Sequence, residues 1–307
     1  MIKAQRFGVE VEMTGVTRAK AASIIAEVVR GQASLPDNTC YHTITIKDQT
    51  SRSWKVMRDS SISTMRNDDS HELLDQYSVE VVTPPLNYED IEIFQTIIRK
   101  LREAGAKTNS SCGIHIHIDG ANHTPTSLKK LINFMVARQD LIYEALNVGA
   151  RGSRWCKKLN SQLLTDMRKN KNLTKASAEL IWYSRANDNY DGGIDHQHYN
   201  PTRYHGINLH SYFSKGTVEF RLFNSTLHAG KIKAYIQFCL AVSAWAITSN
   251  DITVFRSMDG YTAEQKVTIM RNILTHRLGL FGDEFKTCRL WMMKNLKDTA
   301  GMTSRVA

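Results

Sequence analysis

Four stretches of the chain alternate hydrophobic and polar residues with the period of a β-strand. Alternation of this kind gives a strand one apolar face, which can pack on a core, and one polar face. In the stretch over residues 111–119, isoleucines alternate with His115, His117 and Asp119, so that groups able to bind metals or move protons share one face. The four stretches are residues 5–13, 77–83, 111–119 and 217–223.

The remaining hydrophobic pattern predicts mostly helices. Thr124 followed by Pro125 is typical of a helix start, and Gly31 and Gly105 are typical of helix ends. Shorter alternating runs predict a hairpin over 40–47 and 53–58 and a strand over 205–211. The expected helices are residues 17–30, 88–104, 125–147, 155–168, 174–185, 229–248, 262–276 and 282–296.

The order of these elements predicts a single α+β domain over residues 1–298. Strands with charged faces occur early and late in the chain, which favours one interleaved domain over two independent ones. Residues 150–200 are less regular and are expected to form an insert or lid, whereas 60–75 and 187–201 are expected to be loops. Residues 299–307 are expected to be a frayed tail.

Composition narrows the class of protein. The formal net charge of the 307-residue chain is +10, which favours acidic partners, although solvated surface lysine and arginine explain it equally well. Five widely spread cysteines without a CxxC pair argue against a zinc ribbon or disulfide scaffold and for a cytoplasmic setting. No apolar run is long enough to cross a membrane, and the first residues lead into a strand and not into a signal peptide.

The polar faces of the four strands carry an excess of carboxylates. Buried carboxylates are costly unless they are paired or coordinate a cation, and one arginine cannot balance four glutamates. Carboxylates with one or two imidazoles suit Mg²⁺ or Mn²⁺ better than structural zinc, and bound Mg²⁺ usually bridges to phosphates. The pattern therefore indicates a sheet face that binds a Mg²⁺-nucleotide. The residues are Glu10, Glu12, Glu80, His115, His117, Glu219 and Arg221.

Each strand taken alone also has an ordinary structural interpretation. Glu10 and Glu12 would suit a solvated sheet edge, and Glu80 could pair with a lysine. The HxH pair is often structural, and a Glu219–Arg221 ion pair would contribute little. Four strands with the same design nevertheless favour the functional interpretation.

The same residues resemble the motif series of the amidoligase family. This family belongs to the carboxylate–amine ligase superfamily, together with glutamine synthetase and γ-glutamylcysteine synthetase. The resemblance covers about residues 6–245, with the motifs in the expected order, and only the joint pattern is specific. The motifs are Phe7–Met13, Glu80–Leu86, Cys112–Asp119 and Thr217–Phe223.

The resemblance implies a fold and a reaction. The fold is a curved, mostly antiparallel sheet of about six strands, a glutamine synthetase-like split barrel with helices on its outer face. The reaction is amide formation, in which ATP phosphorylates a carboxylate and an amine displaces phosphate from the acyl phosphate. The implied cofactors are ATP and Mg²⁺ or Mn²⁺. The substrates would be small-molecule, peptide or protein carboxylates and amines.

The resemblance also implies roles for individual residues. Glu10, Glu12, Glu80, His115 and Glu219 would form the metal shell. Arg221 would stabilise the transferring phosphoryl group, and Asp59 would bind or deprotonate the amine. The positions assigned to nucleotide or substrate are His117, Arg203, Tyr204 and Asn208.

Other functions remain compatible with the sequence. A guanidino-kinase-like phosphotransferase of the same fold would stop at a phosphorylated product. A metal-dependent hydrolase or nuclease would use the HxH strand without ATP, and a non-catalytic nucleic-acid binder would use the basic insert. The resemblance does not extend to residues 150–200 or to the last 60 residues. His196, His198 and His205 suit either a second metal site or a polar loop.

Overall fold

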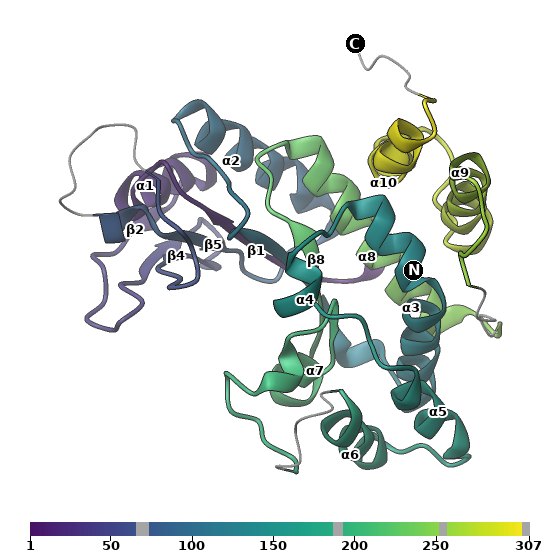
Figure 1. Ribbon diagram of the computed structural model, residues 1–307. Helices are drawn as coiled ribbons and strands as arrows, with labels where there is room; N and C mark the ends of the chain where they lie inside the picture. Colours follow the sequence, from purple (N-terminus) through teal and green to yellow (C-terminus); the bar gives the residue numbers. More distant parts are fainter. Residues whose placement is uncertain (66–73, 187–192, 252–256, 303–307) are drawn as a thin grey trace. The chain divides into compact units, whose positions relative to one another are not determined.

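The chain has an α+β fold built on one eight-stranded antiparallel sheet. The computed structural model describes residues 1–65, 74–186, 193–251 and 257–302 (Figure 1). The strand order is β2-β3-β4-β5-β1-β6-β8-β7. The chain divides into two compact units, which we name the β1 unit (Arg6–Ile116 and Phe223–Lys233) and the β8 unit (Met1–Gln5, His117–Leu222 and Ala234–Ala307). Strands β6 and β8 and helix α8 (Ala229–Thr248) each contribute residues to both units.

The β1 unit contains the hairpin strands and two long helices. Helix α1 packs against α2 and against β3 and β4 (Figure 1). Thr17 caps α1 by accepting a hydrogen bond from the Lys20 amide, and the α1 helix ends in a left-handed residue, Arg30. The elements are β1 Phe7–Met13, α1 Arg18–Val29, β2 Gln32–Ala33, β3 Ile44–Lys47, β4 Ser53–Met57, η2 Leu74–Tyr77, β5 Val79–Val82, η3 Tyr88–Asp90, α2 Ile91–Glu103 and the start of β6 Gly113–Asp119.

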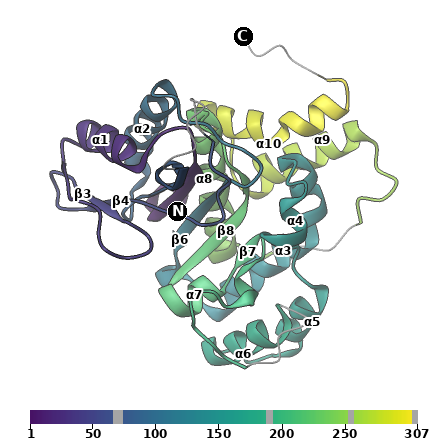
Figure 2. The ribbon, with the colours of Figure 1, turned by 60° about the vertical axis from the view of Figure 1, so that its left-hand side comes forward.

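The β8 unit is mostly helical. Helix α3 begins at Pro125 behind a Thr124 cap and contacts α5 and α10, while α9 and α10 pack together (Figure 2). Helix α6 contacts α5 and α7. The elements are η1 Ile2–Ala4, the end of β6, η4 Gly120–Asn122, α3 Pro125–Leu146, α4 Arg151–Arg154, α5 Ser161–Lys169, α6 Lys175–Arg185, η5 Pro201–Arg203, β7 Ile207–Asn208, α7 His210–Lys215, β8 Thr217–Asn224, α8 Ala229–Thr248, α9 Ala263–Asn272, the π-helical η6 Ile273–Arg277, η7 Asp283–Phe285 and α10 Lys286–Thr299.

The alternation expected from the sequence is confirmed in the central strands. Val9 and Val11 of β1 and Val79 and Val81 of β5 are buried, with no more than 1% of their surface exposed. Glu12, next to Val11, and Glu80, between Val79 and Val81, are shielded as well, since they are only 4% and 8% exposed. The sheet therefore has protein on both faces here, and its charged residues lie in an environment of low dielectric constant.

Two predicted elements are wrong in detail. The expected strand over 205–211 is only the two-residue β7, after which residues 210–215 form helix α7. This helix ends at Gly216, whose φ of +78° suits glycine far better than any other residue. The sheet has eight strands and not the about six that the resemblance implies, and its edge strands β2 and β7 have two residues each. Parts of the predicted loops, at 66–73 and 187–192, and most of the predicted tail, at 303–307, lie outside the described residues.

Two predictions from composition can be compared with the structure. All five cysteines are free thiols, and four of them are buried. Within the described ranges, no helix is both long enough and apolar enough to cross a membrane.

A buried chain of polar groups ties the start of the β8 unit to its longest helices. Gln5 donates a hydrogen bond to the Leu240 carbonyl (2.8 Å) and accepts one from the Ser243 hydroxyl (2.5 Å). The Ser243 hydroxyl also lies 2.9 Å from Nε2 of His123, whose Nδ1 lies 3.0 Å from the Ser127 hydroxyl. Burial lowers the pKa of His123 to about 4, so the ring is neutral at physiological pH.

This histidine predicts how stability depends on pH. The unfolded chain binds a proton to His123 near pH 6.5, whereas the folded chain resists protonation until about pH 4. The free energy of unfolding should therefore fall as pH drops through this interval, by about 3 kcal/mol from this residue. Urea denaturation of wild type and His123→Gln at pH 7.5 and 4.5 measures this drop in the free energy of unfolding. A drop in His123→Gln equal to that of wild type would contradict the role of His123.

Candidate functional site

Strand pairing places two glutamates opposite each other in the β1 unit. In the register of β1 with β5, Glu12 pairs with Glu80, and Glu80 in turn pairs with Met57 of β4. Like charges at directly opposed positions destabilise a sheet, and more so when both are buried. A cation close to these carboxylates would relieve their repulsion.

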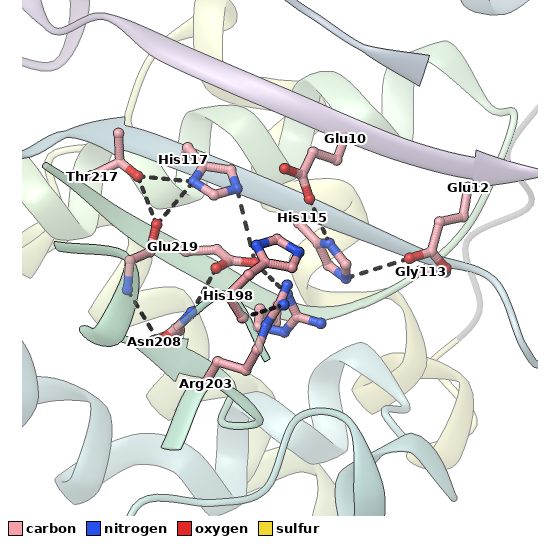
Figure 3. A network of polar contacts seen from close by, with 12 residues as sticks. Glu10, Glu12, Gly113, His115, His117, His198, Arg203, Asn208, Thr217 and Glu219 are labelled. Carbon is pink, nitrogen blue, oxygen red and sulfur yellow. Dashed lines mark hydrogen bonds and ion pairs between the residues drawn. The ribbon is translucent and has the colours of Figure 1, made fainter. Parts of the chain in front are cut away.

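His115 of β6 joins Glu12 to a further glutamate of β1 (Figure 3). Its Nδ1 lies 2.9 Å from Oε2 of Glu10, and its Nε2 lies 3.7 Å from Oε1 of Glu12. The other oxygen of Glu12 accepts a 2.6 Å hydrogen bond from the Gly113 amide. Glu12 is thus fixed by the backbone of the strand that carries the histidine.

The resulting group has the composition of a metal site. Glu12, Glu80 and His115 each offer a ligand atom, and these atoms all lie within 4.8 Å of one another. All three residues are buried, with exposures between 4% and 8%. Two carboxylates and one imidazole suit Mg²⁺ or Mn²⁺, since a structural zinc site would be expected to contain thiolates or more histidines. The residues therefore fit the divalent cation expected from the sequence.

The contact between Glu10 and His115 has the geometry of an orienting bond. If Nδ1–H of His115 donates to Glu10, Nε2 carries the lone pair and is directed toward Glu12, as in many metal-binding histidines. This tautomer is inferred from the two contacts. Glu10 is also less buried than Glu12, with 20% of its side chain exposed against 5%.

Glu10→Gln tests this orienting role. Glutamine keeps the size of the side chain but removes the charge that holds His115 in one tautomer, so Mg²⁺ or Mn²⁺ affinity should fall about 10- to 100-fold. Mn²⁺ titration followed by electron paramagnetic resonance measures the affinity. Glu92→Gln, on the first turn of α2, is the matched control and should bind Mn²⁺ like wild type. Unchanged affinity in Glu10→Gln would exclude the role.

A second polar group surrounds Glu219 in the β8 unit. Asn208 of β7 is the register partner of Glu219 and donates a 2.6 Å hydrogen bond to its Oε2. Arg221, two residues further along β8, donates a 2.5 Å hydrogen bond to Oε1. All three residues are at least 95% buried. Both carboxylate oxygens are therefore held, one by a neutral amide and the other by a guanidinium that balances its charge.

His117 belongs to this second group. Its Nδ1 lies 2.9 Å from the Thr217 hydroxyl, and its Nε2 lies 3.8 Å from Oε1 of Glu219 (Figure 3). The Ser211 hydroxyl lies 2.9 Å from that of Thr217 and 3.4 Å from His117 Nδ1. Because His115 and His117 are two residues apart on one strand, β6 supplies a histidine to each group.

A cavity of about 240 Å³ opens beside Glu219 in the same unit. Its exposed lining residues are His196, His198 and Lys215, and these mark its mouth. Its inner lining is buried and is formed by Asn208, His210, Ser211 and Glu219, with half-buried Arg203 and Ser214 between the two ends.

Two residues predicted from the sequence are joined by aromatic contacts. Arg203 donates to the His198 carbonyl and lies over the rings of Tyr199 and Tyr204. The Arg221 guanidinium also lies over the Tyr204 ring, 5.9 Å from the ring centre. Tyr204 thus supports two arginines by cation–π contact but is not part of the cavity lining.

Asp59 lies in the β1 unit just after β4. Its Oδ1 accepts a 2.7 Å hydrogen bond from the Ser61 amide, and its backbone exchanges hydrogen bonds with the Ser78 hydroxyl. These contacts hold the loop after β4 against Ser78. Ser78 immediately precedes β5, the strand that carries Glu80.

The sequence matches the protein family described as "Putative amidoligase enzyme" over residues 3–243. The match spans both polar groups and the strands that carry them. The chain belongs to this amidoligase family. Among curated proteins, no relative matches the sequence. The family resemblance of the four motifs is confirmed.

Sequence reasoning misses several residues of the amidoligase cavity. His210 and Lys215 lie on helix α7, which the alternating pattern predicts in part as a strand, and no local motif signals them. Thr217, outside the cavity lining, begins a family motif but receives no predicted role, because its contact with His117 is a tertiary one. Of the three histidines considered as a second metal site, His196 and His198 line the cavity, whereas His205 is buried against Trp182.

Proposed function

We propose that this amidoligase is an ATP- and Mg²⁺-dependent carbon–nitrogen ligase that joins a carboxylate to an amine through an acyl phosphate. The observation that carries the proposal is the buried group in which Glu12 opposes Glu80 beside His115. A divalent cation bound there would offset the repulsion between the two buried carboxylates and would be available for the reaction. Family membership supports the type of bond formed.

The proposed metal shell follows the family motifs. It consists of Glu12, Glu80 and His115, with Glu10 either as a ligand or as the partner of His115. The metal role of Glu219, in the β8 unit, is an expectation from the motif alone. Mg²⁺ bound there would neutralise phosphate charge during phosphoryl transfer. The protein orients two of these ligands before the cation binds. The Gly113 amide fixes Glu12, and Glu10 fixes His115.

Arg221 is proposed to stabilise the negative charge that develops on the transferring phosphoryl group. A guanidinium held by Glu219 and by the Tyr204 ring is already oriented, so little rotamer entropy is lost when it contacts an anion. His117 is proposed to contact nucleotide phosphate. Asp59 is proposed to bind the incoming amine or to remove its proton.

The remaining positions assigned to nucleotide or substrate take distinct roles in the proposal. Asn208 holds Glu219, and Tyr204 supports Arg203 and Arg221. Arg203 lines the cavity and is assigned to substrate. All three residues therefore belong to the proposed site, and Arg203 is the one among them that is proposed to contact a ligand.

A coupled assay tests the proposed function. Purified protein with Mg²⁺ and ATP should release ADP and phosphate only when both a carboxylate and an amine are present, and mass spectrometry should detect the amide. ADP released with a phosphorylated product and no amide would favour the phosphotransferase. Cleavage of nucleic acid without ATP would favour the nuclease. Steeply salt-dependent nucleic-acid affinity that survives Glu80→Ala, without turnover, would favour the binding protein.

A further inference from the structure

The cavity in the β8 unit has an excess of positive charge. Arg203 and Lys215 each contribute one cation to its lining. The acidic residue in the lining, Glu219, is balanced by its 2.5 Å contact with Arg221. Outside the lining, Glu179 lies next to His196, so at the mouth a carboxylate and an imidazole also face each other. What remains in the cavity is the charge of Arg203 and Lys215.

His210 lies on the inner wall of the cavity. Burial, together with the nearby charges of Arg203 and His196, lowers the pKa of His210 to about 4. The ring is therefore neutral near pH 7. Its Nδ1 lies 2.7 Å from the Tyr183 hydroxyl. If this hydroxyl donates to Nδ1, Nε2 carries the proton and offers the cavity a neutral hydrogen-bond donor.

The walls of the cavity are held by one helix. On α6, Glu179 contacts His196 and Tyr183 contacts His210, while Trp182 donates a 3.3 Å hydrogen bond to the Thr202 hydroxyl next to Arg203. Trp182 and Tyr183 are almost fully buried. A cavity whose polar lining is fixed from behind has the construction expected of a binding site.

The size of the cavity restricts the ligand. Its volume of about 240 Å³ is below the roughly 300–1,000 Å³ of pockets that enclose drug-sized molecules. This volume suits a small acid better than a whole nucleotide. Arg203 and Lys215 bring two positive charges to the lining, which match the two charges of a small dicarboxylate.

We propose that this cavity binds a carboxylate of a small acidic substrate through Arg203, Lys215 and His210. The substrate is a dicarboxylate, and its second carboxylate, at the Glu219 end, is the one that is activated. This inference rests on the proposed ligase function and names the class of its acid substrate. Arg203 forms charge-assisted hydrogen bonds in a planar arrangement, Lys215 contributes charge at the mouth, and His210 donates from the inner wall.

Calorimetric titration without nucleotide tests the assignment. Wild-type protein is titrated with succinate, glutarate and adipate, with butyrate as a monocarboxylate and with inorganic phosphate. At least one dicarboxylate should bind about tenfold more tightly than butyrate, because it gains a charge-assisted contact. Equal affinity for dicarboxylates and butyrate would overturn the proposal. Tighter binding of phosphate than of every dicarboxylate would overturn the choice of carboxylate.

Variants locate the binding in the cavity. Arg203→Gln should weaken the dicarboxylate at least about tenfold, and Lys215→Gln should weaken it about threefold because an exposed charge is screened. Arg168→Gln and Lys169→Gln, exposed on α5, are the matched controls and should bind like wild type. Near-ultraviolet circular dichroism verifies folding of Arg203→Gln, and the exposed Lys215 gives a second variant that cannot act through the core. Wild-type affinity in both cavity variants would overturn the proposal.

The two proposals fail in different experiments. Dicarboxylate binding that depends on Arg203, without ATP-dependent amide formation from any dicarboxylate and amine, would refute the ligase and leave the binding site. Amide formation from monocarboxylates that is indifferent to Arg203→Gln and Lys215→Gln would refute the dicarboxylate site and leave the ligase.

Discussion

Glu80→Gln is expected to abolish the stabilisation that Mg²⁺ gives to the folded protein. The substitution keeps the shape of a buried side chain that lies opposite Glu12 but removes one of the two negative charges that would hold the proposed cation. A ligand that binds only the folded state stabilises it by about 2.7 kcal/mol at one hundred times its Kd. Wild type should show this gain as a rise in Tm on MgCl₂ titration, and Glu80→Gln should show none.

The same variant should lose catalysis. Without the cation, phosphate charge is no longer neutralised, and kcat/KM for amide formation should fall at least about 10³-fold. Glu89→Gln, exposed in the short helix that precedes α2, is the matched control and should retain both the Mg²⁺ response and activity. A Mg²⁺-dependent Tm shift in Glu80→Gln equal to that of wild type would remove Glu80 from the metal site.

Arg221→Met is expected to have the second largest effect. Loss of a guanidinium that contacts a transferring phosphoryl group lowers kcat by about 10³- to 10⁵-fold. The substitution also leaves Glu219 buried without its 2.5 Å partner, which should cost about 3–5 kcal/mol of stability. The free energy of unfolding from urea denaturation and steady-state kinetics measure the two effects separately.

A double variant separates the stability effect of Arg221 from its chemistry. Glu219→Gln together with Arg221→Met removes both charges and should regain most of the lost stability while activity stays low. Arg221→Lys keeps the charge but not the planar donor pair, so it should fold well and retain only part of kcat. A kcat for Arg221→Met within about tenfold of wild type would show that Arg221 has only the structural role of balancing Glu219.

Much of the sheet could be predicted from the sequence because its central strands have a strict period of two. Valine and isoleucine at alternate positions fix which side chains share a face, and this alternation alone assigns Glu12, Glu80 and His115 to polar faces. The strand register that sets Glu12 directly opposite Glu80 is a tertiary property and could not be predicted.

The cavity could not be predicted because its residues lie on elements without a strong periodic signal. Helix α7 has six residues, too few for a helical pattern to outweigh the alternating residues just before it. Asn208 and Arg203 are indicated by the family resemblance alone, and no local pattern distinguishes the contact of one with Glu219 from the place of the other in the cavity wall. Contacts such as Tyr183 with His210 join residues 27 positions apart.

Helix α6 also bears on how new specificities could arise in this fold. Its side chains hold His196, Thr202 and His210 from behind, and it carries none of the residues proposed to bind the cation or the phosphoryl group. We therefore expect a substitution on its inner face to reshape the proposed acid pocket and to leave the proposed phosphoryl transfer unchanged. Directed evolution of this enzyme for another acid would begin most productively at positions 179, 182 and 183.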